Sequence, residues 1–516
     1  MMVKKAHILS IIFLVLANFA LAQVSLNHKD FSVKGFHLDL RIQVMKMPAL
    51  KAFAKKLSDN GINTLVMEWE ATYPFKDHPM IANRFAYTRE EVTDFISYCK
   101  SINIDVIPLQ QSFGHVEYIL RNYRYKNQRE DQKDYSQVDP LQEDLNRELF
   151  KSLYTDLIST HSSKYIHIGG DETYLLGHSE KSKKKAQELG KGRLYGDYIK
   201  LLCDLVVSLG KTPVLWADIA IKYPDALKYL PKQTIFIDWN YGWDHNMFGD
   251  HSKLLESGFE IWGSPAIRSH PDNYFLTQWE KHFKNIKDFI PAARKFGYNG
   301  MVITSWSTSG LYSPVFETTR DIVDLYAIRR VYPITGFNML IDAYFEAVKA
   351  KEPLNITQFV KNYSAKNYGF NEAQSKTFWE ALTKAPYEIT QGVVSNKDVN
   401  VNKLLDSAKL ASKQLYELKP LKNKEEFEHY RLMADIRVQY LTYSALEIEV
   451  NKPGLKDSRI TEIITELRKI DTAKLDKRFI ALNKYALYDA ELDQENELRN
   501  AKIKLLIQRL SRSKTN

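Results

Sequence analysis

The chain has 516 residues, too many for one compact hydrophobic core, so two or three domains are expected. A hydrophobic fraction of 44% and a charged fraction of 26% are those of a globular protein and exclude a disordered or fibrous chain. The net charge of +9 is compatible with attraction to acidic polymers such as sulfated glycans or nucleic acid. Because "KSKKK" at 181–185 is the only dense basic run, we favour an ordinary solvated surface and expect no nucleic-acid partner.

The first 22 residues have the pattern of a secretory signal peptide. A short basic start, "MMVKK", precedes the apolar run "ILSIIFLVLANFALA", whose last three residues fit a cleavage site of small residues. The alternative is a membrane anchor, but the run is short for the ~20 apolar residues that a spanning helix needs. We therefore expect export to the periplasm or the medium, a mature chain that starts at Gln23, and no membrane span.

Between residues 36 and 306, eight short strand patterns alternate with amphipathic helical patterns. Helical stretches such as "REEVTDFISYCKS" and "YGDYIKLLCDLVVSLG" separate the strands. This alternation predicts an α/β fold, a (β/α)₈ TIM barrel over residues 23–334. A doubly wound open sheet is the structural alternative, but no G-x-G-x-x-G follows the first strand. The strands are expected at 36–40, 62–69, 105–110, 165–169, 212–216, 234–239, 259–263 and 300–306.

After about residue 335 the strand patterns stop. Segments such as "FEHYRLMADIRVQYLTYSALEIEV" and "ELRNAKIKLLIQRLSR" combine helical periodicity with abundant charge. They predict an α-helical C-terminal domain over residues 335–516 that packs against the barrel and could also mediate a homodimer. The two cysteines, Cys99 and Cys203, fall in helical patterns of the barrel region and are expected to be buried free thiols.

In a (β/α)₈ barrel the working face lies at the carboxyl ends of the strands. Six of the chain's eight tryptophans fall at these predicted ends. Aromatic rings stack on the C–H faces of pyranose sugars, so tryptophans that converge on one rim predict a sugar pocket; the alternative is that they fill the core. The residues expected at the strand ends are Asp39, Arg41, Glu68, Trp69, Glu70, His115, Asp171, Glu172, Trp216, Asp218, Asp238, Trp239, Trp243, Trp262 and Trp306.

The fourth predicted strand ends in "HIGGDE", with Asp171 and Glu172 side by side. Most glycosidases place two carboxylates ~5–9.5 Å apart on opposite sides of the scissile bond, whereas neighbouring residues have Cα atoms only ~3.8 Å apart. A different division of roles fits better. Glu172 would be a general acid with a raised pKa, and Asp171 would hold a part of the substrate that supplies the nucleophile. The two glycines let the backbone turn and approach the ligand.

"HIGGDE" matches the H-x-G-G-D-E signature of family 20 glycoside hydrolases, the β-N-acetylhexosaminidases, which this chain resembles over roughly residues 34–330. "GFHLDLR", ending at Arg41, the Gly-His pair at 114–115 and the Asp-Pro pair at 139–140 are weaker matches in family order. The resemblance implies an exo-acting enzyme that needs no cofactor or metal and releases a terminal β-linked N-acetylhexosamine, GlcNAc or GalNAc, from a glycan.

The family mechanism is retaining and substrate-assisted. The acetamido oxygen of the sugar attacks C1 and forms an oxazoline. By resemblance, Asp171 orients the acetamido group, while Glu172 acts first as acid and then as base. The substrate-binding residues that the resemblance implies are Arg41, His115, Trp216, Trp239, Tyr274 and Trp306.

The chain also departs from the family pattern. The segment "LQQSFGH" has Leu109 and Gln111 where the family carries carboxylates, so a group that would orient His115 is absent and the tuning of the acid is open. After the eighth strand the family often has W-x-E, whereas this chain has Trp306-Ser307-Thr308, which leaves the choice of hexosamine open. The small α/β domain that usually precedes the barrel is missing as well. These departures indicate a divergent branch.

Two other functions are compatible with parts of the pattern. "GGDE" also begins the G-G-D-E-F signature of cyclic-dinucleotide synthases, but residue 173 is Thr and the motif ends a strand in a barrel series. A non-catalytic glycan-binding barrel is the main alternative, although the intact Asp171 and Glu172 argue against lost chemistry. His167 is expected to be a buried structural residue rather than a metal ligand.

Overall fold

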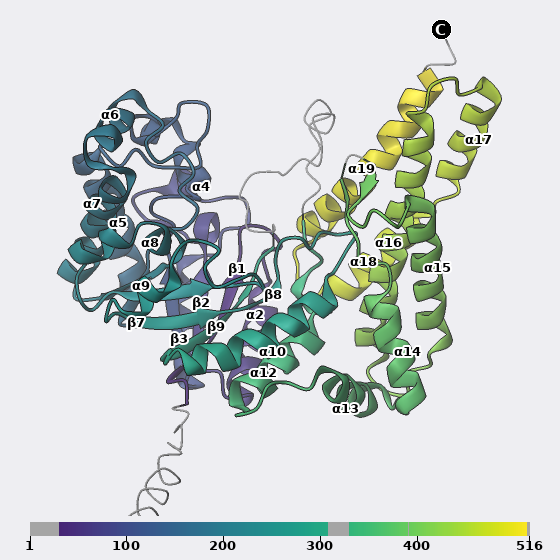
Figure 1. The fold of residues 1–516 in the computed structure, drawn as a ribbon, viewed down its shortest axis with the longest axis horizontal. Helices are drawn as coiled ribbons and strands as arrows, with labels where there is room; N and C mark the ends of the chain where they lie inside the picture. The colour runs from purple at the N-terminus through teal and green to yellow at the C-terminus, as the bar shows by residue number, and fades with distance from the viewer. Residues whose placement is uncertain (1–29, 308–329, 391, 513–516) are drawn as a thin grey trace, which may run out of the picture.

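The structure is a computed structural model that describes residues 30–307, 330–390 and 392–512. The predicted signal peptide at 1–22 and Thr308 lie outside these ranges. The described chain forms a closed parallel barrel beside a set of C-terminal helices (Figure 1). Among the described residues, no helix is both long and apolar enough to cross a membrane.

Eight parallel strands form the barrel, as the sequence predicts. Their order is β1 to β7 and then β9, and β9 pairs back with β1 to close the sheet. Each predicted strand is found within three residues of its expected bounds. The barrel strands are β1 (Val33–Asp39), β2 (Thr64–Glu68), β3 (Asp105–Leu109), β4 (Tyr165–His167), β5 (Thr212–Trp216), β6 (Ile235–Trp239), β7 (Glu260–Ser264) and β9 (Gly300–Ser305).

One short strand, β8 (Ala266–Arg268), was not expected from the sequence. It follows β7 after Pro265 and pairs with the upper end of β9. Proline has no backbone N–H to donate, so it interrupts the ladder and splits the seventh barrel strand in two. The split carries the chain outward across the rim and brings Ser269 and His270 to the barrel's working face.

Helices cover the outside of the barrel, and the helical patterns in the sequence correspond to them. The covering helices are α2 (Met47–Asp59), α3 (Arg89–Ser101), α5 (Glu143–Thr160), α7 (Lys191–Ser208), α10 (Trp279–Lys295) and α12 (Asn338–Lys349). Shorter helices lie in the connections: α4 (Glu117–Leu120), α6 (Glu180–Leu189), α8 (Asp218–Lys222) and α9 (His251–Leu255). The 3₁₀ turns are η1 (Glu70–Thr72), η2 (Pro79–Ile81), η3 (Tyr123–Gln128), η4 (Pro224–Tyr229) and η5 (Ile334–Gly336). Cys99 and Cys203 are buried free thiols in α3 and α7.

Helix α12 packs on the barrel as its last covering helix. The hydroxyl of Tyr344 lies 2.7 Å from the carbonyl oxygen of Gly35 in β1 and 2.9 Å from that of Met301 in β9. The eighth β/α unit therefore runs to Lys349, and the domain boundary expected at residue 334 falls inside it. Helical periodicity looks the same in a barrel helix and in a helix of the next domain, so the sequence pattern could not place this boundary.

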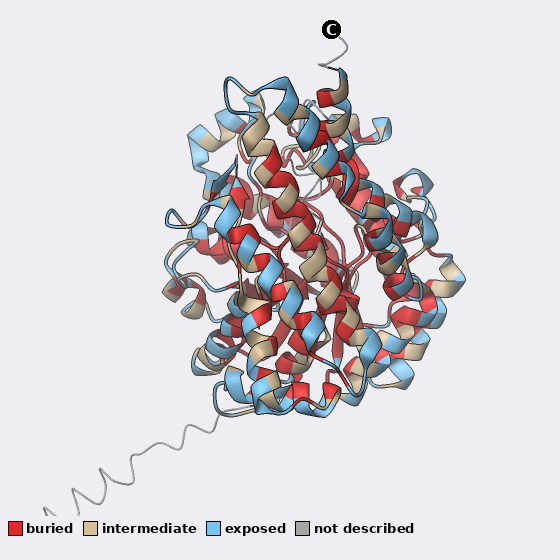
Figure 2. Cartoon of the chain, turned by 90° about the vertical axis from the view of Figure 1, so that its right-hand side faces the viewer, coloured by how far each residue is buried: buried red, intermediate tan, exposed pale blue. Residues whose placement is uncertain are grey.

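The C-terminal region is helical, as predicted, with one two-stranded hairpin. Figure 2 faces these helices and shows exposed residues on their outer faces and buried residues between them. The helices are α13 (Ile356–Tyr368), α14 (Glu372–Thr383), α15 (Val401–Glu417), α16 (Lys424–Val450), α17 (Asp457–Arg468), α18 (Thr472–Asn483) and α19 (Asp489–Arg512), and the hairpin strands are β10 (Ile389–Thr390) and β11 (Val393–Val394).

Helix α19 reaches the working face of the barrel with a buried carboxylate. Glu495 is fully buried, forms an ion pair with Arg330, and accepts a hydrogen bond of 3.2 Å from Gln43 Nε2. Gln43 Oε1 in turn accepts one of 2.9 Å from Arg268 Nη1 at the end of β8. Removing one partner of a buried charge pair is strongly destabilising. The C-terminal helices are thus an integral support of the barrel rim.

Candidate active site

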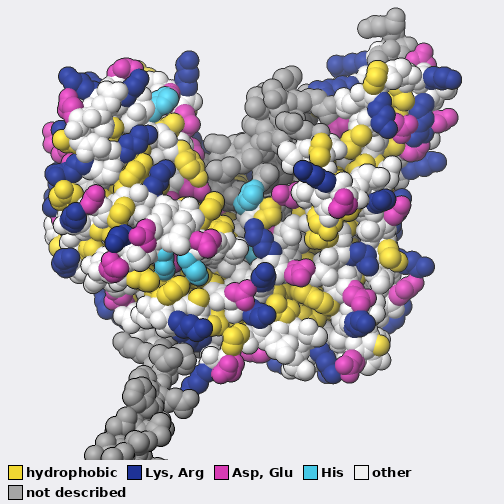
Figure 3. Space-filling model, viewed as in Figure 1, with side chains coloured by type: hydrophobic (Ala, Val, Ile, Leu, Met, Phe, Trp, Pro, Cys, Tyr) yellow, Lys and Arg dark blue, Asp and Glu magenta, His cyan; other side chains and the backbone are white. Residues whose placement is uncertain are grey.

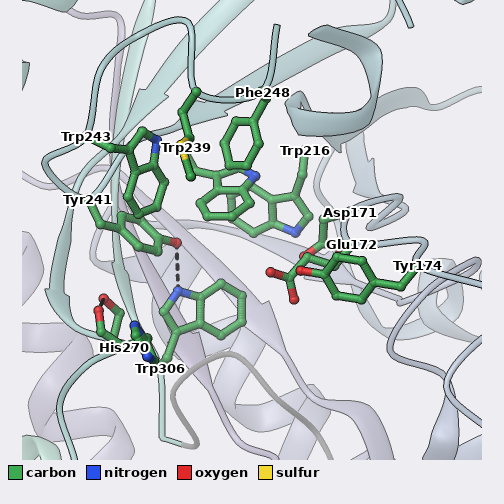
Figure 4. A pocket seen from close by; sticks show the side chains of 12 residues that line it. Asp171, Glu172, Tyr174, Trp216, Trp239, Tyr241, Trp243, Phe248, His270 and Trp306 are labelled. Atoms are coloured by element: carbon green, nitrogen blue, oxygen red, sulfur yellow. Dashed lines mark hydrogen bonds between the residues drawn. The ribbon is translucent and has the colours of Figure 1, made fainter. Parts of the chain in front are cut away.

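A pocket of about 380 Å³ opens at the carboxyl ends of the barrel strands (Figure 4). Its side chains come from the connections after β4, β5, β6, β8 and β9, the position of the active site in this type of barrel. The lining residues are Asp171, Glu172, Tyr174, Trp216, Trp239, Tyr241, Trp243, Met247, Phe248, Ser269, His270 and Trp306. The predicted pair and three of the tryptophans assigned to sugar binding therefore lie around one cavity.

The two glycines after β4 make the bend that the sequence predicts. Gly169 and Gly170 have φ values of +74° and +91°, a region that other residues rarely adopt. A Cβ atom on Gly169 would lie only 1.9 Å from Gln111 Oε1, so a larger residue here would also have to displace the Gln111 side chain. His167 is buried as expected, and its Nδ1 accepts a 3.0 Å hydrogen bond from the Gly169 amide.

The bend turns Asp171 and Glu172 into the pocket, and His115 lies against both of them. His115 Nε2 is 3.4 Å from Asp171 Oδ2 and 3.3 Å from Glu172 Oε2. Burial alone would lower the pKa of His115. The charge of Asp171 and hydrogen bonds to both carboxylates outweigh burial and hold the pKa well above its ordinary value. His115 is therefore an imidazolium between two carboxylates at neutral pH.

This contact lowers the pKa of Glu172, contrary to the raised pKa expected from the sequence. Burial raises the pKa of Glu172, but the hydrogen bond and the positive charge of His115 lower it more, with a further contribution from the Tyr174 hydroxyl. In the free protein Glu172 is thus held as a carboxylate. For Glu172 to act as an acid, the contact with His115 has to weaken when a substrate binds, so that the pKa of Glu172 rises.

Replacing His115 with Gln should move the alkaline limb of the kcat/KM profile to higher pH. That limb reports loss of the acid's proton in the free enzyme. The His115 charge lowers the pKa of Glu172, so its removal lets burial dominate, and the pKa and the limb rise together. The measurement is a pH–rate profile of both proteins on one substrate. His178→Gln, at an exposed histidine paired with Asp131, is the control and should leave the limb in place. A limb that stays or falls in the His115 variant contradicts this electrostatic role.

A third acidic residue, Asp218, supports the pair from the connection after β5. It is buried; its Oδ2 accepts a 3.1 Å hydrogen bond from the Glu172 amide, and its Oδ1 accepts one of 3.3 Å from Trp239 Nε1. Glu172 has a φ of +45°, which is costly for a residue with a side chain, so this anchor stabilises a strained backbone. Burial and the charge of Asp171 raise the pKa of Asp218 to about 8. The sequence placed Asp218 at a strand end but gave no sign of its role.

Aromatic side chains form the floor and one wall of the pocket. Trp306 Nε1 donates a 2.8 Å hydrogen bond to the Tyr241 hydroxyl, the dashed line in Figure 4. The Trp306 ring lies 6.0 Å from Trp216, and Trp239 meets Trp243 edge-on at 5.3 Å between ring centroids. These buried and half-buried rings give flat apolar surfaces next to the two carboxylates, as a sugar pocket requires.

The other two strand-end tryptophans belong to the core. Trp69 packs edge-on against Tyr87 and Phe95, and its indole N–H donates to His161 Nε2. Trp262 is fully buried, and its edge-on partner is Tyr165 at the start of β4, toward the amino end of the barrel. Both readings of the tryptophan pattern therefore apply, each to a different subset.

Arg41 and His115 lie behind the lining residues rather than among them. The Arg41 guanidinium is 5.3 Å from the centroid of the Trp306 ring. Its Nη2 donates to Glu68 Oε1 at 2.8 Å and its Nε to Glu70 Oε1 at 3.0 Å. Arg41 thus supports the pocket floor through Trp306. Within the described ranges, no group of three or more His, Cys, Asp and Glu side chains is arranged to hold a metal ion.

Tyr274 does not reach the pocket, which corrects the assignment made by resemblance. It is buried in a separate small cavity between the start of α10 and the C-terminal helices α14 to α16. The split of the seventh strand is the reason, because it directs His270 toward the pocket and carries Tyr274 past it. Two tyrosines line the pocket, the buried Tyr241 and the exposed Tyr174 at its mouth. Tyr241 lies two residues beyond the end of β6, so the alternation of side chains along a strand could not have indicated its position.

A (β/α)₈ barrel with a carboxylate pair beside a pocket walled by tryptophans defines a glycoside hydrolase. Comparison with known proteins gives the family. The profile described as "Glycosyl hydrolase family 20, catalytic domain" matches residues 36–316, more than half of the chain, and the chain belongs to this family of β-N-acetylhexosaminidases.

The similar proteins are distant relatives. Hexosaminidase D of Bos taurus is 24% identical over 298 residues, which cover 54% of this chain and 86% of that protein. Hexosaminidase D of Homo sapiens is 23% identical over 304 residues, or 56% of this chain and 62% of that protein. The solved structure of a β-N-acetylhexosaminidase from Bacteroides fragilis NCTC 9343 shares the fold with a TM-score of 0.50 at 16% identity, over 65% of this chain and 69% of that one.

Proposed function

We propose that this protein is an exo-acting glycosidase that releases a terminal β-linked GlcNAc or GalNAc from a glycan with retention of configuration. The observation that carries the proposal is the adjacent pair Asp171 and Glu172, which faces an aromatic pocket from a single strand end. Two neighbouring carboxylates cannot flank a sugar ring from opposite sides at the separation that an acid and an enzymic nucleophile need. Membership of family 20 supports the same conclusion.

The acetamido oxygen of the substrate is the proposed nucleophile. It forms a bond to C1 while the bond from C1 to the leaving oxygen breaks, and Glu172 gives its proton to that oxygen. Asp171 accepts a hydrogen bond from the acetamido N–H, and its negative charge balances the positive charge that develops on this nitrogen in the oxazolinium. Among the described residues, no donor reaches the buried Asp171 Oδ1, so an acceptor is available for this N–H. Water then attacks C1, the Glu172 carboxylate takes its proton, and the acetamido group is restored.

The pocket suits one sugar ring with the rest of the glycan outside. Its volume of about 380 Å³ lies near the lower end of the range for small-molecule sites. Trp216 and Trp306 form its buried base, whereas Tyr174 and Met247 at the mouth are largely exposed. A closed base and an open mouth support removal of a terminal residue rather than cleavage within a chain.

The test is hydrolysis of 4-nitrophenyl N-acetyl-β-glucosaminide and N-acetyl-β-galactosaminide. We expect turnover of at least one, and competitive inhibition by N-acetylglucosamine-thiazoline, which resembles the oxazoline. No turnover on any aryl hexosaminide would instead favour a non-catalytic glycan-binding barrel. Turnover without thiazoline inhibition would show that the protein is a glycosidase but that Asp171 does not act on the acetamido group of the substrate. We also propose export, on the leader pattern at 1–22, which would place the substrate outside the cytoplasm.

A further inference from the structure

Two connections at the pocket's edge pack into one surface, which we call the basic rim. One follows β3 and carries Arg121, Arg124 and Lys133; the other includes α6 and carries Lys181, Lys183 and Lys184. All six side chains are exposed. The buried Glu130 joins the two connections, because its Oε1 accepts hydrogen bonds from the amides of residues 178 and 179 at 2.8 and 2.9 Å. In Figure 3, Lys and Arg side chains (dark blue) lie along the upper edge of the left-hand part of the molecule, where Figure 1 labels α6.

A short stretch of chain and a hydrogen bond connect the basic rim to the mouth of the pocket. Only seven residues separate Glu172 from the start of α6 at Glu180. Within that stretch the exposed Tyr174 lines the mouth, and the amide of Leu175 donates a 2.9 Å hydrogen bond to Gln137 Oε1 in the connection after β3. We therefore expect a glycan that leaves the pocket past Tyr174 to run toward α6 and the connection after β3.

Positive charge is concentrated on these two connections. Residues 121–137 and 178–193 hold 11 lysines and arginines against 5 aspartates and glutamates, a net charge of +6 where the whole chain has +9. One of the five acids, Glu130, is buried under the surface. Cationic clefts near a site attract anionic ligands and raise their rate of association.

The lysines of α6 are poorly placed for the stability of the helix itself. Lys181, Lys183 and Lys184 lie in its first half, where the helix dipole favours acids, and Lys181 and Lys185 form a like-charge i,i+4 pair. No acidic partner reaches Lys181, Lys183 or Lys184 within the part of the chain that the structure describes. Neither the stability of the helix nor ion pairing explains why these lysines are clustered here, and their ammonium groups are open to a ligand.

We propose that the basic rim binds sulfate or carboxylate groups on the sugars beyond the terminal hexosamine, so that the preferred substrate is an acidic glycan. This inference rests on the proposed function and specifies its substrate class. The pocket lining contains Asp171 and Glu172 and no lysine or arginine, so the terminal sugar itself is expected to be uncharged. The anionic groups belong on the part of the glycan that lies outside the pocket.

The test compares wild type with the triple variant Lys181→Gln, Lys183→Gln and Lys184→Gln. Three substrates of matched length carry a terminal β-N-acetylhexosamine on a neutral, a sulfated or a uronic-acid sugar, and a neutral aryl hexosaminide is the fourth. We expect wild type to prefer the charged substrates at low ionic strength, and the variant to lose about tenfold in kcat/KM on them alone. The two charged substrates show which anion is recognised.

The matched control is Lys403→Gln, Lys409→Gln and Lys413→Gln on the exposed face of α15, which removes the same charge far from the rim. It should behave as wild type. The inference is overturned if wild type shows no preference for charged substrates, if the control loses as much as the rim variant, or if the rim variant loses equally on neutral substrates. The aryl hexosaminide separates these results from a failure of the proposed function, because only the latter abolishes its hydrolysis by wild type.

Discussion

Replacing Glu172 with Gln should lower kcat/KM about 10²- to 10⁴-fold on glycans, the usual contribution of a general acid. Glutamine keeps the shape of the side chain but has no proton to give to the leaving oxygen. The loss should be much smaller in the first step for a 4-nitrophenyl glycoside, because that leaving group departs without protonation. The measurement is kcat/KM of both proteins on substrates that differ only in the acidity of the leaving group.

The dependence on leaving group is what identifies the acid. A variant that is merely misfolded would lose the same factor on every substrate, and thermal unfolding of the two proteins provides a further check. Glu380→Gln, at an exposed glutamate of α14, should leave all rates unchanged. An equal loss on acidic and basic leaving groups would show that Glu172 acts on binding or structure rather than on proton transfer.

The fold could be predicted because each strand is short, apolar and followed by a helix with clear periodicity. Such alternation leaves few arrangements other than a parallel barrel. The break at Pro265 was harder to anticipate, because β8 has only three residues and looks like part of a loop. The assignment of α12 to the barrel depends on the contacts of Tyr344 with β1 and β9, and no local pattern encodes contacts so distant along the chain.

The catalytic pair could be proposed from sequence because the reason for it is local: two glycines turn one strand end into the pocket. The supporting residues are not local. Asp218 reaches the Glu172 amide from the connection after β5, and Tyr241 rather than Tyr274 lies in the pocket lining. The sequence indicates which residues lie at strand ends, but the arrangement of neighbouring strands decides which of them contact the catalytic pair.

The structure also bears on the missing carboxylate before His115. Gln111 stands in its place and donates a 3.0 Å hydrogen bond to Glu68, so it does not orient the imidazole. Asp171 and Glu172 themselves stabilise the protonated form of His115, because they contact it directly and raise its pKa. A substrate whose acetamido group engages Asp171 would alter one of the two contacts that keep His115 charged. We expect binding to weaken the contact between His115 and Glu172, so that the pKa of Glu172 rises and its protonation is favoured when a substrate is in place.

Replacing Asp171 with Asn should lower kcat about 10²- to 10³-fold, the range for removing one group that stabilises developing charge in a transition state. Asparagine fills the same space but carries no negative charge to balance the oxazolinium. The loss should fall on the acetamido-dependent step. A substrate series with zero to three fluorines on the acetamido methyl group measures this, because each fluorine makes the acetamido oxygen a poorer nucleophile.

For wild type, log kcat/KM should fall steeply along the fluorine series, since the acetamido oxygen forms the bond to C1. For the Asp171→Asn variant all members should be slow. A flat series in wild type would mean that water or a protein group is the nucleophile, and Asp171 would then have another role. If the series is steep in wild type but the Asp171→Asn variant is as active as wild type, the acetamido oxygen is the nucleophile and Asp171 does not stabilise the developing charge. The two results therefore identify the nucleophile and the residue that stabilises its charge independently of each other.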